Sequence, residues 1–226
     1  MNRILWVTTV SVAFCGWSSA AVARDIQVIS SHRYVIARIE NSGGPEDYFQ
    51  TDGLELFNTS ASASFLTVNT AFAAQNSMIS NDGIVGFQQA QAVNGSAPPN
   101  SLFSIAESAW DMTFQVTTAN AFTFDATFTT VNQNSVLSPS QFTLTGTGLS
   151  IHQDLGFIPG VVTRHETGVL QPGVVYTLHS RMFAQMIAGD PAHTVTADYS
   201  IAFTPIPSAG VLPLLALGSL VRRRRR

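Results

Sequence analysis

The sequence predicts an all-β fold, an antiparallel β-sandwich, and three observations lead to this prediction. Apolar and polar residues alternate over short stretches, β-branched and aromatic residues are frequent within them, and clusters of Gly, Pro, Asn and Asp separate them. Alternation with a period of two places one apolar face of each strand on a core. Closely spaced turn residues are typical of antiparallel connections.

The clearest alternation lies in the middle of the chain. Trp110, Met112, Phe114 and Val116 alternate with polar residues, and residues 122–128 repeat the pattern. Similar stretches predict strands at 34–39, 65–72, 84–93, 142–145, 174–183 and 194–203. Residues 59–75 contain alanines typical of a helix, but their alternating Ser and Thr favour a strand. Turn residues separate the stretches at 41–45, 52–53, 81–83, 94–100, 146–148, 159–160 and 172–173.

The C-terminal end combines an apolar stretch with a block of arginines. Residues 206–221 carry no charge and are followed by Arg222, Arg223, Arg224, Arg225 and Arg226. As a helix, this apolar stretch would span about 24 Å, less than the roughly 30 Å of a bilayer core. It would cross only with local thinning of the bilayer, and the arginines would stay on the cytoplasmic side. These features indicate a temporary membrane anchor.

Ile206 and Pro207, the small residues after them, the apolar stretch and the terminal arginines resemble the PEP-CTERM sorting tails of exported bacterial proteins. The match is to the planctomycete-type variant that opens with Ile-Pro, although Ser208 and Ala209 replace the Glu and second Pro of the namesake motif. The resemblance implies an exosortase-like membrane protease, the export machinery, the membrane and exopolysaccharide as partners. An ordinary tail anchor, or an apolar end on a soluble chain, remains the alternative.

The N-terminal end has the three parts of a secretory signal peptide. Arg3 is positively charged, residues 4–15 are apolar, and Ala21 and Ala23 form a small-x-small cleavage site. A transmembrane helix is the alternative, but the apolar run is short for it. Cleavage after Ala23 would remove Cys15, the only cysteine, so the mature protein would contain no disulfide.

The body of the chain is acidic and lacks lysine. Between residues 25 and 205 there are four arginines and fourteen carboxylates, a formal charge of 4 − 14 = −10. Such a surface disfavours nucleic acid, which requires a basic face. Without lysine, neither a P-loop nor a Schiff base can form. The length is enough for one hydrophobic core.

The second half of the body contains a further recognisable arrangement. Strands predicted at 110–118, 121–131 and 142–146 precede Leu170, a Pro172-Gly173 turn, and then Tyr176 and Leu178. This arrangement resembles the jelly-roll modules of many exported bacterial proteins, in which a similar hairpin precedes the final two strands. The resemblance implies a sandwich of jelly-roll type closed by residues 194–204. It implies no single function, because jelly rolls bind sugars, mediate adhesion or serve as structural parts.

No catalytic pattern emerges from the sequence. A Gly-x-Ser-x-Gly elbow is missing, and Asp154 with Glu166 is only one of many carboxylate pairs that fourteen acids permit. The five histidines lack the spacing of a zinc site: His32, His152, His165, His179 and His193. We therefore expect no catalytic residue, no cofactor and no metal ligand.

Two weaker signals concern ligands. The turns 52–53 and 81–83 offer oxygen atoms to Ca²⁺, although turn formation alone explains their residues. Aromatic residues available for stacking on sugars are Trp110, Tyr34, Tyr48, Tyr176 and Tyr199, and the phase of Trp110 with Met112 favours a place in the core.

These observations predict three parts: a signal peptide at 1–23, a β-sandwich at 24–204 and a sorting and anchor segment at 205–226, with a short hydrophobic helix at the end. The expected protein is exported, held transiently at the inner membrane, and then located at the cell surface or outside. Its expected role is structural or interactive in the extracellular matrix. A carbohydrate-binding module, assisted by Ca²⁺, is the alternative function, and a hydrolase with a carboxylate pair is a third.

Overall fold

The described part of the chain is built of β-strands alone. The computed structural model describes residues 26–40, 45–65, 69–95, 103–132, 140–155, 159–187 and 192–206. These residues form twelve strands and no helix: β1 (Ile26–Glu40), β2 (Glu46–Thr51), β3 (Phe57–Phe65), β4 (Asn69–Ile79), β5 (Gly83–Asn94), β6 (Phe103–Val116), β7 (Asn120–Val131), β8 (Gln141–Gly146), β9 (Leu149–Asp154), β10 (Gly160–Leu170), β11 (Val175–Ile187) and β12 (His193–Pro205). The predicted all-β class is confirmed.

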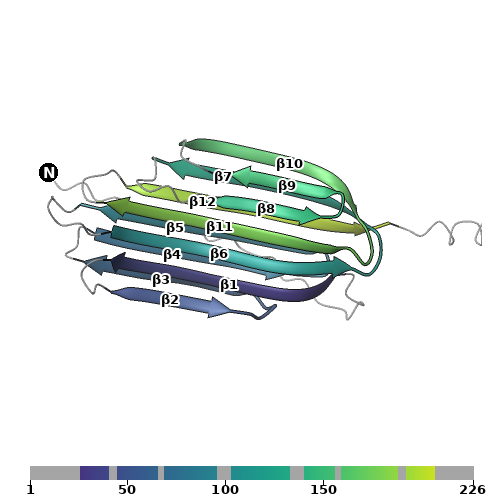
Figure 1. Cartoon of the computed structure of the whole chain (residues 1–226), viewed down its shortest axis with the longest axis horizontal. Helices are drawn as coiled ribbons and strands as arrows, with labels where there is room; N and C mark the ends of the chain where they lie inside the picture. Colours follow the sequence, from purple (N-terminus) through teal and green to yellow (C-terminus); the bar gives the residue numbers. More distant parts are fainter. Residues whose placement is uncertain are drawn as a thin grey trace, which may run out of the picture.

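The strands form two six-stranded antiparallel sheets that pack as a sandwich (Figure 1). We call them sheet A, with the order β2-β1-β6-β11-β8-β9, and sheet B, with the order β10-β7-β12-β5-β4-β3. From β5 onward the chain changes sheet at every connection except the one between β8 and β9. Before β5, the pair β1-β2 and the meander β3-β4-β5 extend one side of the sandwich.

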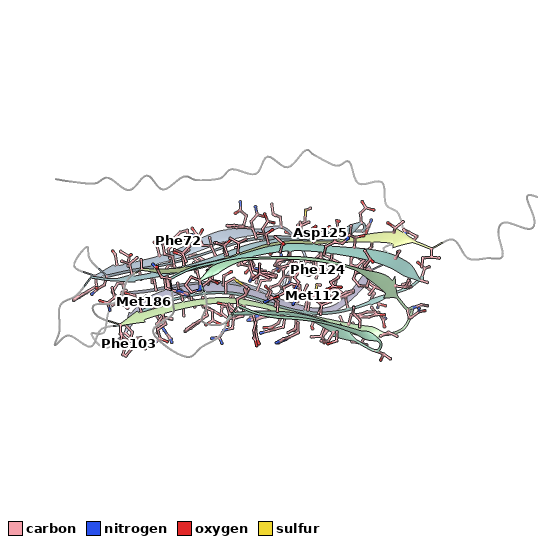
Figure 2. The ribbon with its side chains drawn as sticks, turned by 90° about the horizontal axis from the view of Figure 1, so that it is seen from above. Phe72, Phe103, Met112, Phe124, Asp125 and Met186 are labelled. Carbon is pink, nitrogen blue, oxygen red and sulfur yellow. The ribbon has the colours of Figure 1, made fainter. Side chains whose placement is uncertain are left out.

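Strand alternation fills the space between the sheets. Seen from the side, Met112 and Phe124 point between the two layers and Asp125 points away from them (Figure 2). Met112 and Phe124 are 1% and 0% exposed, whereas Asp125 is exposed. The period of two seen in the sequence therefore corresponds to an inward and an outward face.

Aromatic rings form one part of this core and alanines another. The ring of Phe142 from sheet A stacks on Phe124 at 4.9 Å between centroids and meets Tyr199 edge-on at 5.0 Å. Both partners belong to sheet B, so aromatic contacts join the two layers. Toward the β3 edge of sheet B, the core is instead formed by buried alanines of β3, β4 and β5: Ala61, Ala63, Ala71, Ala73, Ala90 and Ala92.

The side chain of Arg33 is fully buried between the sheets. From β1, its Nη1 donates to the carbonyl oxygen of Ser77 at 3.1 Å and to the Ser77 hydroxyl at 3.2 Å. Its Nη2 donates to the carbonyl oxygens of Glu55, at 2.7 Å, and Gly53. Arg33 thus joins sheet A to β4 of sheet B and to the segment that connects β2 with β3.

Aromatic rings also contact the Arg33 guanidinium. Its central carbon lies 5.4 Å from the centroid of Phe57 and 5.5 Å from the centroid of Trp110. Burial lowers the pKa of Arg33, and the nearby Tyr199 acts in the opposite direction. Among the described residues no carboxylate forms an ion pair with Arg33, so carbonyl dipoles and ring faces offset its desolvation.

Two further polar contacts cross the core. The hydroxyl of Ser108 on β6 donates to Gln75 Oε1 on β4 at 3.5 Å, and the hydroxyl of Ser180 on β11 donates to Gln88 Oε1 on β5. All four side chains are buried. Buried polar pairs of this kind favour one relative placement of the two sheets, because displacement would leave them without partners.

His193 begins β12 and is 2% exposed. Its Nδ1 donates to the carbonyl oxygen of Asn132 at 3.1 Å. Asn132 has a φ of 62°, in the left-handed region that Asn tolerates better than most residues. Burial lowers the pKa of His193 more than backbone hydrogen bonds, to Asn132 among others, raise it.

Two expectations about the strands are wrong. Residues 65–72 are not one strand, because β3 ends at Phe65 and β4 begins at Asn69. The two strands pair antiparallel and share Ala, Ser and Thr alternation, so the pattern does not mark where one strand ends and the next begins. The Pro172-Gly173 turn does not form a hairpin either, since β10 and β11 lie in different sheets. A turn motif indicates a change of direction but not which sheet the next strand joins.

Both predicted processing segments lie outside the described residues. These are the signal peptide at 1–23 with Ala21 and Ala23, and residues 207–226 with Pro207 and the five terminal arginines. Ile206 is described, is 41% exposed, and donates its N–H to the Ala119 carbonyl oxygen at 2.9 Å. Within the described part of the chain, no helix has the length and hydropathy needed to cross a membrane.

We predict that Arg33→Ala lowers the free energy of unfolding by about 3–5 kcal/mol, because it opens a cavity and removes the donors for one buried and two partly buried carbonyl groups. Arg38→Ala is the control, since Arg38 is 40% exposed and pairs with Glu40 at 2.8 Å. That change should cost less than about 1 kcal/mol. Urea unfolding measures both values, and equal losses would contradict the role of Arg33.

We predict that His193 makes the fold less stable in acid. The unfolded chain takes up a proton on this ring near the ordinary pKa of 6.5, whereas the folded chain does so only at lower pH. Stability should therefore fall as pH drops through this window. In urea unfolding at pH 8, 7, 6 and 5, the advantage of wild type over His193→Gln should shrink with acidity. A constant difference would contradict the prediction.

Candidate functional site

Several polar and aromatic side chains gather on the outward face of sheet A. We call this surface the polar face, and it comprises His32, Tyr34, Tyr48, Asp52, Glu107, Asp111, Gln141, His179 and Arg181. Alternation explains their common direction. On β1, β6 and β11, the neighbours Arg33, Trp110 and Ser180 point into the core, so the residues beside them point outward.

A row of side chains crosses the centre of the polar face. His32 on β1 lies opposite Asp111 on β6, which in turn lies opposite His179 on β11. The His179 Nδ1 forms a hydrogen bond with the Asp111 carboxylate, and the Nε2 lies 2.8 Å from Gln141 Nε2. Because the Gln141 amide donates, His179 accepts at Nε2 and donates from Nδ1.

A second cluster surrounds Glu107. Its Oε1 accepts from the Tyr34 hydroxyl at 2.6 Å and from Arg181 Nε at 2.7 Å, and its Oε2 accepts from Arg181 Nη2 at 3.2 Å. Burial and the hydrogen bond to Glu107 raise the pKa of the Tyr34 hydroxyl. For Arg181, burial lowers the pKa, but Glu107, Tyr34 and Asp111 together raise it more, so the net shift is upward. The cluster therefore keeps a neutral phenol and a charged guanidinium in fixed positions.

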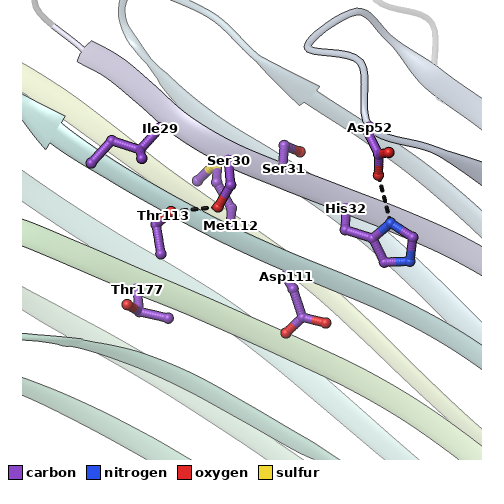
Figure 3. Close-up of a pocket in the computed structure, with 9 residues that line it drawn as sticks. All are labelled: Ile29, Ser30, Ser31, His32, Asp52, Asp111, Met112, Thr113 and Thr177. Carbon is purple, nitrogen blue, oxygen red and sulfur yellow. Dashed lines mark hydrogen bonds and ion pairs between the residues drawn. The ribbon is translucent and has the colours of Figure 1, made fainter.

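A shallow hollow of about 410 Å³ adjoins this row where β1 bulges (Figure 3). The register between β1 and β6 shifts between Val28 and Ser30, which leaves Ile29 as the extra residue and 54% exposed. The hollow is lined by Ile29, Ser30, Ser31, His32, Asp52, Asp111, Met112, Thr113 and Thr177.

Two hydrogen bonds fix the walls of the hollow. His32 Nδ1 lies 2.6 Å from Asp52 Oδ1, and the hydroxyls of Ser30 and Thr113 lie 2.5 Å apart (Figure 3). The carboxylates of Asp52 and Asp111 retain further acceptor capacity, and the side chains of Asp52 and Asp111 are 81% and 51% exposed. The hollow thus presents acceptors and hydroxyl groups beside the apolar side chains of Ile29 and Met112.

Two tyrosines continue the aromatic surface beyond His32. The ring centroids of His32 and Tyr34 are 5.6 Å apart, and those of Tyr34 and Tyr48 are 6.1 Å apart. Tyr48 is 44% exposed. The hollow and these aromatic rings therefore lie on one face, along β1 and its neighbour β2.

The structure separates the aromatic residues singled out in the sequence. Trp110, Tyr176 and Tyr199 are 0%, 1% and 2% exposed and belong to the core. The expected core position of Trp110 is confirmed. Tyr34 and Tyr48 lie together on the polar face, which leaves these two for contact with a ligand.

The residues considered for metal or acid chemistry are scattered. Asp52 of the first turn lies at the hollow. The second turn, 81–83, lies in sheet B, where the N–H of Ser80 donates to the carbonyl oxygen of Gly83 at 2.8 Å. Asp154 and Glu166 belong to different sheets, on β9 and β10. In the described ranges, no three His, Cys, Asp or Glu side chains converge on a point where a metal ion could bind.

Sequence reasoning missed Glu107, Asp111 and Arg181. The signal in the sequence was the alternation of polar and apolar residues, because these three residues occupy polar positions of β6 and β11. Alternation indicates that each points outward, but only the order of the strands places Arg181 beside Glu107, which lies 74 residues earlier in the sequence.

Searches with this sequence return no matching protein-family model and no matching curated protein. The polar face and the sequence patterns at the two ends of the chain are therefore the features that bear on function.

Proposed function

We propose that this chain is an exported protein of the cell surface or extracellular matrix whose β-sandwich has an interaction role. The polar face carries this proposal. It combines a shallow hollow, fixed polar side chains, the exposed Tyr48 and the partly buried Tyr34 on a sheet whose other side is a filled core. Ligand sites favour such preformed polar groups on rigid elements.

We further propose that β5 to β12 form a jelly roll. Support comes from strand order: β5-β12-β7-β10 in sheet B lies against β6-β11-β8-β9 in sheet A. Two interlocked Greek keys in eight consecutive strands have this order. The first four strands would then be an addition that widens both sheets on the side of β5 and β6, and this addition carries His32, Tyr34 and Tyr48.

The proposed location rests on the two ends of the chain. Ala21 and Ala23 form the proposed signal cleavage site, and Ile206, Pro207 and the arginines at 222–226 form the proposed PEP-CTERM-like sorting signal. Export machinery would deliver the chain, and an exosortase-like protease would remove the tail. The lysine-free acidic body suits an extracellular role without nucleic acid.

Glycan binding is the specific interaction that the polar face favours. Exposed tyrosines stack on sugar rings, and carboxylate and hydroxyl groups form hydrogen bonds with sugar hydroxyls. Asp52 and Asp111 would repel uronic acids unless a Ca²⁺ ion bridged the charges. A neutral polysaccharide is therefore the ligand class that fits best.

We predict that intact mass spectrometry of the native protein shows a chain shortened at both ends. Cleavage after Ala23 and removal of the tail near residue 206 would account for the loss. Recovery of the uncut chain of 226 residues from the cytosol would contradict the proposed export and sorting.

We predict that the protein binds neutral exopolysaccharide and that Tyr48→Ala weakens binding about tenfold, because a stacking surface is lost. Phe87→Ala is the matched control, since Phe87 is 38% exposed on the outward face of sheet B. Affinity electrophoresis with neutral and uronic-acid polymers, each with and without a chelator, measures the effect. Equal loss in both variants would exclude the polar face as the site.

A further inference from the structure

Strand β10 (Gly160–Leu170) forms one edge of sheet B and is exposed on both faces. It pairs with β7 along its whole length, and among the described strands none pairs with its other edge. Residues 160–167 are all exposed, and Val161 and Val169 are 65% and 47% exposed. An edge of this kind presents a row of backbone N–H and C=O groups to another chain.

The other sheet edges are less open to pairing. β2 and β9 have six residues each, and β3 lies against β2. In contrast, β10 has eleven residues and contains no proline and no lysine, and its pairing with β7 shows no bulge. Proline, lysine and a bulge, which often protect a long edge strand from pairing, are therefore missing from it, although Arg164 and Glu166 place charges on it.

The sequence of β10 is complementary to its own reverse. Around His165, residues at equal distances on either side are identical or opposite in charge in three of the four nearest pairs: Arg164 with Glu166, Thr163 with Thr167, and Val161 with Val169; the fourth pair is Val162 with Gly168. If two copies of the strand ran antiparallel with His165 opposite His165, every Arg164 would face Glu166 of the second copy. Cross-strand pairs of opposite charge stabilise a sheet, and pairs of like charge destabilise it.

Geometry leaves few alternatives to this register. Two identical strands that pair antiparallel are related by a two-fold axis perpendicular to the sheet, so residues directly opposite share one face. From one allowed register to the next, the partner of each residue therefore shifts by two positions. One neighbouring register places Arg164 opposite Arg164, and the other places Glu166 opposite Glu166. Both bring like charges together, and larger shifts leave fewer residues of the strand paired, so the register centred on His165 is favoured.

We propose that two copies of this chain associate through antiparallel pairing of β10 in this register, so that two copies of sheet B become one continuous sheet. The contact is isologous and closes at a dimer. Existing contacts hold the charged groups in place. Arg164 Nε donates to Gln153 Oε1 on β9 at 2.8 Å, and His165 Nδ1 lies 2.6 Å from Asp125 Oδ1 on β7.

The dimer would leave the polar face free in both copies. The hollow lies on β1 and β6, toward the β2 edge of sheet A, whereas β10 lies beside β9. An axis perpendicular to the sheet keeps both polar faces on the same side of the assembly. A repeating polymer could then contact two sites at once, and the linkage would raise its apparent affinity.

Charge reversal tests the pairing. The full-length chain is purified in a mild non-ionic detergent that disperses its apolar ends, and sedimentation velocity measures the dimer dissociation constant. Arg164→Glu and Glu166→Arg should each raise this constant at least about tenfold, because each places like charges opposite one another. The double variant Arg164→Glu with Glu166→Arg should return it to within about threefold of wild type.

A cysteine cross-link tests the register. In a Cys15→Ser background, His165→Cys should form an intermolecular disulfide under mild oxidation, since opposite residues have Cα atoms about 4.5–5.5 Å apart. Thr163→Cys is the matched control. It faces residue 167 of the second copy, so two such cysteines would lie more than about 10 Å apart and should not cross-link.

The proposal would be overturned by a wild-type chain that stays monomeric at high concentration, by a dimer that both single charge reversals leave unchanged, or by a double variant that folds but does not regain the dimer. Circular dichroism establishes that each variant folds. Assembly beyond the dimer would also contradict a closed isologous contact. Glycan binding by a monomer would leave the proposed function intact while removing this inference.

Discussion

The buried guanidinium of Arg33 connects the interior of the sandwich to its polar face. A cation between two sheets is costly unless acceptors surround it, so the segment after β2 must bring the Gly53 and Glu55 carbonyl groups to Nη2. The same segment carries Asp52, whose carboxylate bonds to His32, the residue beside Arg33 on β1. One wall of the hollow therefore depends on a charge that lies on the other side of the sheet.

The filled core restricts where this molecule can recognise anything else. Phe142 packs against Phe124 and Tyr199, and these contacts occupy the space between the layers. Recognition is left to the outward faces and the strand edges. The proposed glycan site and the proposed dimer contact use these two kinds of surface on different sheets, so the two proposed interactions would not compete for the same residues.

Parts of the candidate site were visible in the sequence, but their grouping was not. Tyr34, Tyr48 and the Asp52-Gly53 turn were recognised as separate features. The hydrogen bond between Arg181 and Glu107 was not, because strand order alone brings residues so far apart in the sequence together. Strand β10 was not predicted from the sequence, for a different reason. Both of its faces are exposed, so the alternation that marks a half-buried strand is missing.

The sequence by itself determined the all-β class, most strands of the core and the acidic, lysine-free surface, because a period of two and a residue count are local properties. It also contains the terminal patterns on which the proposed export rests. Only the tertiary structure decided that β10 and β11 belong to different sheets, that Arg33 lies in the core, and that His32, Asp111 and His179 form one row. Those outcomes depend on which strands become neighbours. Strand pairing joins residues that are far apart in the sequence, and which strands pair depends on how the whole core packs.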